Sequence, residues 1–397
     1  MIADPSSQEL LETRREILAM VRDFVDERII PAAPEYDRAD EFPDAIVEEM
    51  KELGLFGITV PEEHGGLGLD LITYAMVCEE LARGWMSITG VVNTHFLGVW
   101  MLMHHGTDEQ RQKWLPKMAT GEWRAAYSMT EPHAGSDVQA IKATAVRDGD
   151  ELVLNGQKMW VTNGLRSGLA FVLFKTDPDA QPPYRGMTCV VIEKEPGADR
   201  VGGLTVPPKI RKLGYKGVET TELILEDHRV PAGNVLGGEA GLGQGFKQMM
   251  AAIEVGRINV AARGLGVARR ALEISLRYAQ ERESMGKPIA QHQLVQAKLA
   301  NMATKIEAAR ALTYTAAEKR ERGERADVET GMAKLFSTEM CDEVVNDAFV
   351  IHGGYGYSDE YPIERLIRDT KGMLVTEGTS DILRLVIAKG LLRQHKI

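Results

Sequence analysis

Hydrophobic residues recur at helical spacing near the start of the chain. Ile17, Val21 and Phe24 follow one another at intervals of four and three, with arginine and glutamate nearby. That period places the apolar side chains on one face of an amphipathic helix. We expect this helix to end at Pro31 and Pro34, since proline has no backbone N–H to continue the hydrogen bonding.

The helical pattern continues to about Trp123. A second helix is expected after Pro43, because proline suits the first turn of a helix, and this helix closes near Gly54. Asp108 is expected to cap a further helix, DEQRQKWLPKM. The N-terminal part of the chain is therefore predicted to be helical.

Short β-rich runs replace the helical period from residue 124 to about residue 237. The runs are LVLNG, KMWVTNG, LAFVLFKT, MTCVVIEK, LTVPP and TTELILEDHRV. Segments with turn chemistry, such as DGD, NG, DPDAQPP and GYKG, separate them. Strands at this spacing are typical of a sandwich or a barrel, and the absence of alternating strands and helices argues against a Rossmann fold.

After Gly245 the pattern is helical again to the end of the chain. One long helix is expected up to a break near residues 285–288, and a second is expected to end at Gly323. A third is expected over residues 327–352, and a short last one over residues 380–392. Long amphipathic helices with short connections favour a four-helix bundle.

These patterns predict a mostly α-helical protein with a middle β-domain. The expected domains are an N-terminal helical domain over residues 1–123, a β-domain over residues 124–237 and a C-terminal four-helix bundle over residues 238–397. A chain of 397 residues is long enough for two or three such domains, each with its own core.

The charge balance excludes one class of partner. Lysine and arginine total 47 and aspartate and glutamate total 58, so the formal charge is 47 − 58 = −11. Nucleic acids and anionic membranes are bound by extended basic faces, so we expect neither partner. A local basic pocket for a phosphorylated ligand remains compatible with this composition.

Cysteine and histidine patterns give no metal or disulfide signal. The three cysteines are an odd number without a C-x-x-C pair, so we expect neither a disulfide framework nor a cysteine zinc site. No H-E-x-x-H motif is present, and no metal is expected.

No run of about 18 apolar residues predicts a membrane span. The acidic N-terminal segment lacks the apolar core of a signal peptide, so a cytoplasmic protein is expected, or one of the mitochondrial matrix if it is a processed eukaryotic form.

Three segments carry candidate chemistry. The segment AYSMTEPHAGSD, residues 126–137, offers hydroxyl and backbone N–H donors, although a surface turn explains its composition equally well. Trp160 and Thr162 are expected on one face of a strand, where they could bind a flat heteroaromatic ring or be a core tryptophan beside a surface threonine. Glu377 precedes a helix that Thr379 or Ser380 caps; a carboxylate there is usually solvated.

The whole chain resembles the acyl-CoA dehydrogenase family. The resemblance rests on several long motifs in order: FPDAIVEEMKELGLFGITVPEEHGGLGL, AYSMTEPHAGSD with LNGQKMWVTNG, YAQERESMGKPIAQHQ, IHGGYGYSDEYPIERLIRD and TEGTSDILR. It implies an N-terminal helical domain, a middle β-domain and a C-terminal four-helix bundle, in agreement with the periodicity. It also implies bound FAD and an acyl-CoA thioester substrate.

The resemblance assigns roles residue by residue. The cofactor-binding positions that it implies are Tyr127, Met129, Thr130, Ser136, Trp160, Thr162, Arg282, Gln293, Gly353, Gly354, Thr379 and Asp381. Of these, Thr162 is implied near the flavin N5 atom. The pair Gly353 and Gly354, with Arg282 and Gln293, is implied to contact the FAD of a neighbouring subunit. The implied substrate contacts are Ser136, Arg257, Glu377 and Gly378.

Glu377 matches the position of the family's catalytic base. A base is needed to remove the proton α to a thioester carbonyl, and burial makes a carboxylate more basic. The β-hydrogen then leaves as a hydride to the flavin and gives a 2-enoyl-CoA. Some branches carry a base at the position that is Gly256 here; Glu254 is close to it, and we expect an i,i+3 ion pair with Arg257 instead of a catalytic role.

The resemblance also implies partners and leaves alternatives. It implies an electron-transfer flavoprotein as electron acceptor, a homotetramer built as a dimer of dimers, and a role in lipid metabolism such as fatty acid β-oxidation. Val350, Met285 and Thr376 depart from the usual family residues, in two cases at FAD contacts and in one before the base. The alternatives are an acyl-CoA oxidase, a desulfinase-like enzyme, an N-hydroxylase, or a non-catalytic relative without flavin.

Overall fold

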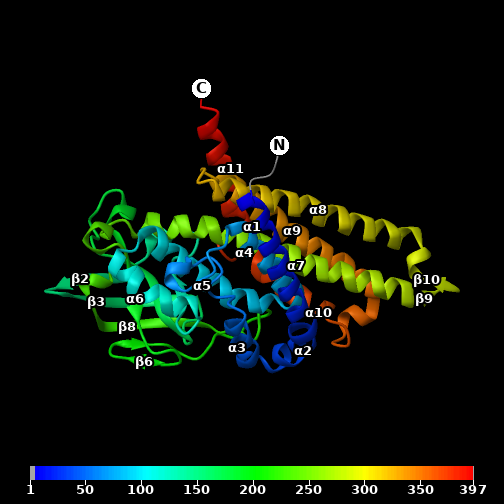
Figure 1. Cartoon of the computed structure of the whole chain (residues 1–397), viewed down its shortest axis with the longest axis horizontal. Coiled ribbons are helices and arrows are strands. Elements are labelled where there is room, and N and C mark those ends of the chain that lie inside the picture. The colour runs from blue at the N-terminus through cyan, green and yellow to red at the C-terminus, as the bar shows by residue number, and fades with distance from the viewer. Residues whose placement is uncertain (1–4, 397) are drawn as a thin grey trace.

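The computed structural model describes residues 5–396, and Figure 1 shows a sheet at one end and long helices at the other. Helices come first, as the periodicity predicts. They are α1 Pro5–Phe24, the π-helical turn Val25–Ile29, α2 Ile30–Ala39, α3 Asp44–Glu52, α4 Leu71–Gly84, α5 Met86–His105 and α6 Asp108–Ala119.

Two helix boundaries differ from expectation. The chain stays helical through Pro31 and Pro34, because a five-residue π-helical turn precedes Pro31 and takes up the change in hydrogen bonding. Thr107, and not Asp108, caps α6: its hydroxyl accepts from the Gln110 backbone N–H at 3.2 Å, and its own N–H donates to the Gln110 side chain at 3.1 Å. This reciprocal capping box satisfies two donors, which a single aspartate cap does not.

The middle region forms one curled mixed sheet. Its strand order is β1-β4-β2-β3-β8-β7-β6, with β5 paired to β4, and β1 runs parallel to β4. The strands are β1 Arg124–Ser128, β2 Thr144–Asp148, β3 Glu151–Thr162, β4 Ser167–Lys175, β5 Met187–Glu193, β6 Arg200–Val201, β7 Leu204–Thr205 and β8 Thr220–Pro231.

Strand β3 corrects the expected turn at Asn155-Gly156. The two runs that this pair was expected to separate form a single twelve-residue strand. Its pairing with β8 shifts around Gly156, which has φ +140, and shifts again between Lys158 and Val161. Glycine here accommodates a β-bulge, and a bulge bends the strand without reversing it.

The C-terminal region contains the long helices that position the site. They are α7 Gly245–Glu281, α8 Gln293–Glu321, α9 Asp327–His352, α10 Ile363–Met373 and α11 Ser380–Gln394, with a small hairpin of β9 Glu283–Ser284 and β10 Lys287–Pro288 after α7. Helix α7 packs against α4, α5, α8 and α9. Helix α10 was not predicted from the sequence, and α11 projects from the body of the molecule (Figure 1).

Helix α5 lies in the core. It is long and apolar enough to cross a membrane, the one such helix in residues 5–396, but 89% of its apolar window is buried inside the protein. It packs on α7 and on strand β1.

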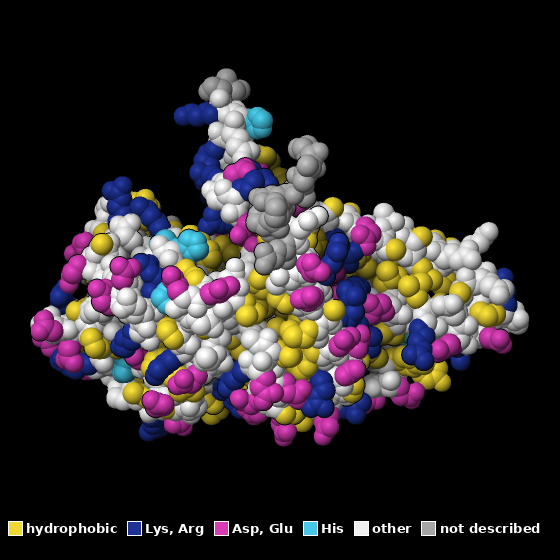
Figure 2. Space-filling model, viewed as in Figure 1, with side chains coloured by type: hydrophobic (Ala, Val, Ile, Leu, Met, Phe, Trp, Pro, Cys, Tyr) yellow, Lys and Arg dark blue, Asp and Glu magenta, His cyan; other side chains and the backbone are white. Residues whose placement is uncertain are grey.

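All three cysteines are buried and free. On the face in Figure 2, basic and acidic side chains are interspersed across the surface.

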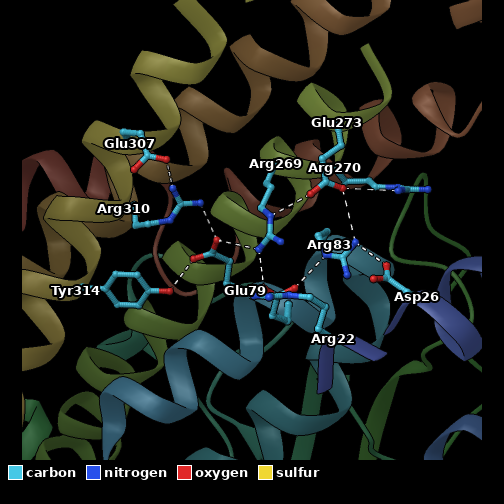
Figure 3. Close-up of polar contacts among 11 residues, drawn as sticks. Arg22, Asp26, Glu79, Arg83, Arg269, Arg270, Glu273, Glu307, Arg310 and Tyr314 are labelled. Carbon is cyan, nitrogen blue, oxygen red and sulfur yellow. Dashed lines mark hydrogen bonds and ion pairs between the residues drawn. The ribbon is translucent and has the colours of Figure 1, made fainter. Parts of the chain in front are cut away.

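A buried ion network joins the N-terminal helices to the bundle (Figure 3). Glu80 on α4 accepts from Arg269 on α7 at 2.7 Å and from Arg83 at 3.0 Å. Its neighbour Glu79 accepts from Arg310 at 2.8 Å and from the Tyr314 hydroxyl at 2.6 Å, both on α8. Burial acts to raise the pKa of Glu80, but the bonded arginines outweigh it and lower that pKa.

We expect Glu80→Gln to lower the free energy of unfolding by about 2 kcal/mol, the value typical of hydrogen bonds to charged groups. Because the pKa of Glu80 is lowered on folding, its contribution is present above its ordinary pKa of 4.5 and is lost as pH falls through the lowered value. Urea unfolding at neutral and acidic pH measures this. An unchanged midpoint at neutral pH would contradict a stabilising role for the network.

Candidate active site

Glu377 stands in the short loop between α10 and α11. Its backbone is left-handed, with φ +52, a conformation that is uncommon outside glycine, and Gly378 follows with φ +92. The Glu377 Oε1 atom accepts from the Asn93 side-chain amide on α5 at 2.6 Å. The other oxygen, Oε2, is buried without a hydrogen-bond partner among the described residues. The carboxylate therefore keeps one oxygen free inside the protein.

Gly256 on α7 lies directly against the Glu377 carboxylate. A Cβ atom added to Gly256 would overlap Glu377 Oε2 and would lie 3.0 Å from a methyl group of Leu97. A side chain at position 256 would therefore compete with the carboxylate for the same space. The structure thus places the two candidate base positions, 256 and 377, at one point, and only Glu377 supplies a carboxylate there.

The surroundings of Glu377 act on its pKa in opposite directions. Burial raises this pKa. The positive charges of Arg263, Lys334 and Arg257, together with the hydrogen bond from Asn93, lower it, but burial prevails. A carboxylate held in this way is a stronger base than an exposed one. The nearby cations still stabilise the ionised form of Glu377.

Lys334 on α9 holds the loop that carries the candidate base. Its side chain is fully buried, and its ammonium group donates to the Gly378 carbonyl oxygen at 2.9 Å. Burial lowers the pKa of Lys334 to about 8, with Glu377 opposing the change. Lys334 therefore both positions the backbone beside Glu377 and contributes positive charge to the site.

Trp160 and Thr162 lie at the end of β3 next to the loop of residues 126–137. The Met159 N–H donates to the Thr130 carbonyl at 3.0 Å, which joins strand and loop. Trp160 has φ +63 at the second bulge of β3 and is 54% exposed, whereas Val161 is buried. An indole that stays exposed beside a partly exposed threonine can cover a flat ligand.

Asn163 connects this strand to the helix that carries Asn93. Its side-chain amide donates to the Val91 carbonyl on α5 at 3.1 Å and to the Ala125 carbonyl on β1 at 3.3 Å. Asn93 follows Val91 by two residues. The end of β3 is therefore joined to the helix whose Asn93 bonds Glu377.

Four of the predicted cofactor positions lie elsewhere. Arg282, Gly353 and Gly354 line a pocket of about 560 Å³ at the far end of α7, and the guanidinium of Arg282 lies 5.8 Å from the ring of Tyr355. Gln293 is exposed at the start of α8 and is not among the lining residues. From Gly256 to this end, α7 rises about 39 Å. One chain does not bring these residues to Glu377.

The remaining predicted cofactor positions differ in burial and in hydrogen bonding. The Tyr127 hydroxyl donates to the Met249 carbonyl at 2.8 Å, and Met129 is buried. Ser136 is exposed. The Thr379 hydroxyl caps α11 by accepting from the Ile382 N–H at 3.2 Å, and Asp381 is exposed and pairs with an arginine one turn on. These roles remain predictions.

Arg257 is 3% exposed, and its Nε atom has no hydrogen-bond partner among the described residues. The expected i,i+3 ion pair is not formed at contact distance, since no Glu254 oxygen lies within 4.0 Å of the Arg257 nitrogens. Glu254 still acts on Arg257 through its charge. Burial raises the pKa of Glu254. Arg257 is thus available to a ligand near Glu377.

Sequence reasoning missed Asn93, Arg263 and Lys334. Each is a buried polar residue inside a helix of mostly apolar or small residues, as in GVVNTHF, VAARGLG and GMAKLF. That mismatch between a polar residue and its buried position is a usable signal, since buried polar groups are expected to have a partner or a function.

Asn93 allows a direct test of the electrostatics. Asn93→Leu removes the hydrogen bond that lowers the pKa of Glu377, so that pKa rises further. Because a base acts only when ionised, we expect the acidic limb of the pH profile of substrate-dependent flavin reduction to move to higher pH. Thr94→Val is the matched control, since the Thr94 hydroxyl bonds the Gly90 carbonyl. An unshifted profile in Asn93→Leu would contradict the assignment.

Family models match nearly the whole chain. The acyl-CoA dehydrogenase N-terminal domain matches residues 11–122, the middle domain residues 126–228 and the C-terminal domain residues 243–392.

Individual relatives extend the match over full lengths. An acyl-CoA dehydrogenase of Bacillus subtilis is 41% identical over 374 residues, 94% of this chain and 96% of that protein. A 3-(aryl)acrylate reductase of Clostridium sporogenes is 40% identical over 389 residues, 96% of this chain and 99% of that protein. Among solved structures, one described as the electron-transferring flavoprotein of Acidaminococcus fermentans superposes with a TM-score of 0.90 at 37% identity, covering 96% of this chain and 98% of the other.

Proposed function

Given that this chain belongs to the acyl-CoA dehydrogenase family, whose members are FAD-dependent flavoproteins, we propose that Glu377 is the base of an acyl-CoA dehydrogenase reaction. The observation that carries this proposal is the Glu377 carboxylate, which has one oxygen fixed by Asn93 and the other buried and free. Glu377 takes the proton from the α-carbon of an acyl-CoA thioester, and the product is a 2-enoyl-CoA.

The geometry around Glu377 suits proton abstraction. The Asn93 amide fixes the direction of the carboxylate, and Lys334 fixes the backbone beside it. Burial makes the carboxylate more basic, which is what removal of a weakly acidic α-proton requires. The free oxygen Oε2 is the atom assigned to receive that proton.

Two groups are available for the negative charge that develops on the thioester oxygen. The Glu377 backbone N–H makes no hydrogen bond to any acceptor in the described part of the chain. Arg257 adds a buried positive charge whose Nε atom is unpaired among the same residues. Donors that are already in place where charge develops are the largest single source of catalysis in many enzymes.

The residues fit FAD. Trp160 presents an exposed indole at the end of β3. Ser128, at the end of β1, and Ser380, at the start of α11, have buried hydroxyl groups without partners among the described residues. When bound, FAD supplies the acceptor for the β-hydrogen, which leaves the substrate as a hydride. The chain itself supplies orientation, charge and proton transfer.

The separation of the two site clusters supports assembly into an oligomer. Arg282, Gly353 and Gly354 lie at the opposite end of α7 from Glu377, so they can serve only a cofactor whose other half is held by a second copy. The proposal is a homotetramer in which this pocket completes the cofactor site of a neighbouring subunit. An electron-transfer flavoprotein is the proposed electron acceptor.

An anaerobic titration of the FAD-loaded protein with straight, branched and cyclic acyl-CoAs tests the proposed function. Loss of the flavin absorbance with one class of thioester, together with formation of the matching enoyl-CoA, is expected. A fully yellow protein that no thioester reduces would contradict the proposal. Rapid reoxidation by O₂ would identify an oxidase.

A further inference from the structure

Arg263 is a buried cation that lacks a carboxylate partner at contact distance. It lies on α7, is 5% exposed, and has no carboxylate oxygen within 4.0 Å in the described part of the chain. Its Nε atom donates to the Asn259 side-chain oxygen at 2.7 Å, which fixes the guanidinium without supplying a negative charge. A buried charge in this state is unfavourable unless an anion reaches it.

The position of Arg263 points it toward the site. It follows Gly256 by two turns of α7, or about 10.5 Å along the axis, and helical side chains lean toward the N-terminal end. Among the groups that lower the pKa of Glu377, Arg263 has the largest effect. The charge of Arg263 therefore acts on the candidate base.

Tyr215 closes the same region from the other side. The Arg263 Cζ atom lies 5.8 Å from the centre of the Tyr215 ring. A Cβ atom added to Gly90 would overlap the Tyr215 hydroxyl, so that hydroxyl lies directly against α5, one turn before Asn93. The Tyr215 backbone N–H is held by the Asp369 carboxylate at 2.6 Å, which anchors its loop to α10.

A further polar group without a hydrogen-bond partner lies near Glu377. Asn93 is 3% exposed and bonds Glu377 through its amide nitrogen, but its oxygen Oδ1 is buried without a partner among the described residues. The region beyond Glu377 is thus bounded by a cation, a phenol and an amide. An unbranched fatty acyl chain would leave all three groups facing hydrocarbon, which is unfavourable.

We propose that the site takes a short acyl-CoA whose acyl group ends in a second carboxylate, and that Arg263 binds this carboxylate with help from Tyr215. The inference deepens the proposed function and rests on it, because it names the substrate class of the same site. An arginine fork suits a carboxylate, and a site built around such a pair rejects a neutral analogue strongly.

The test compares three thioesters with the FAD-loaded protein: glutaryl-CoA, its terminal methyl ester, and butyryl-CoA. We expect wild-type kcat/KM for flavin reduction to be at least ~10-fold higher with glutaryl-CoA than with the neutral methyl ester. Arg263→Gln is expected to lose about 100-fold more with glutaryl-CoA than with butyryl-CoA, because loss of the Arg263 charge acts on Glu377 with both substrates, whereas only glutaryl-CoA carries the second carboxylate. Arg270→Gln, on the same helix and paired with Glu273, is the matched control.

A binding measurement separates recognition from chemistry. Calorimetric titration of glutaryl-CoA into the Glu377→Gln holoenzyme should give a dissociation constant that rises about 100-fold when Arg263→Gln is added. Equal losses with glutaryl-CoA and butyryl-CoA in Arg263→Gln would overturn the inference and make Arg263 a charge partner of Glu377 only. A wild-type preference for butyryl-CoA would also overturn it while leaving the proposed function intact. Failure of every thioester to reduce the flavin would instead overturn the proposed function.

Discussion

Glu377→Gln is expected to leave FAD bound and to slow flavin reduction by acyl-CoA at least ~10³-fold, within the range contributed by a positioned general base. Glutamine keeps the size of the side chain and can still accept from Asn93 through its amide oxygen, so the loop should keep its conformation. What it loses is the ability to accept a proton at Oε2. Stopped-flow absorbance at the flavin band, with FAD content checked first, measures the loss.

Glu254→Gln is the control for this experiment. Glu254 is also a partly buried glutamate near Arg257, and burial raises its pKa as it does for Glu377. It does not contact Glu377 at hydrogen-bonding distance, and we expect its replacement to reduce the rate much less. A larger loss in Glu254→Gln than in Glu377→Gln would move the base to α7 and contradict the assignment.

Lys158→Met is expected to destabilise the protein by about 3–5 kcal/mol, because it removes one partner of a buried ion pair. The Lys158 ammonium donates to Glu131 Oε1 at 2.8 Å, and the two side chains are 0% and 2% exposed. Burial acts to raise the pKa of Glu131, but the charge of Lys158 and the hydrogen bonds to the carboxylate outweigh it. Without Lys158 the carboxylate would be left buried and poorly compensated.

Two comparisons make this prediction specific. The double variant Lys158→Met/Glu131→Gln should recover part of the stability, because no uncompensated charge remains. Lys158→Met alone should lose less stability at mildly acidic pH, where the Glu131 carboxyl can take up a proton. Lys158 precedes Trp160 on β3, and Glu131 lies in the loop of residues 126–137. FAD should therefore be released most readily by Lys158→Met, less readily by the double variant and least readily by the wild type. Equal stability of wild type and Lys158→Met would contradict the role of the pair.

The order of helical, β and helical regions was predictable from periodicity, because the apolar spacing changes where the secondary structure changes. The positions of single turns were less predictable. Asn155-Gly156 has the chemistry of a hairpin turn, yet it forms a bulge inside β3, because pairing along β8 continues on both sides. Pro31 and Pro34 do not end the helix, because the π-helical turn before them takes up the change in hydrogen bonding that proline causes.

The catalytic candidate was predictable only by resemblance, and its contacts with Asn93, Lys334 and Arg263 were not predictable from local sequence. Glu377 is 284 residues from Asn93 in the chain, and the two meet only through packing of α5 against α7 and the loop after α10. Lys334 on α9 and Arg263 on α7 act on the same carboxylate through their charges. Local sequence patterns carry no information about such contacts, whereas a polar residue inside an apolar helix indicates that a contact of some kind exists.

The most direct test of the account is a single anaerobic turnover with an acyl-CoA that carries deuterium at the α-carbon. If Glu377 removes the α-proton, flavin reduction in the wild type should slow relative to the unlabelled substrate, and the enoyl-CoA product should have lost one of its two α-deuterium atoms. The Glu377→Gln variant should give almost no product. Flavin reduction by the labelled substrate at an unchanged rate, or formation of the enoyl-CoA by Glu377→Gln at close to the wild-type rate, would contradict the central claim.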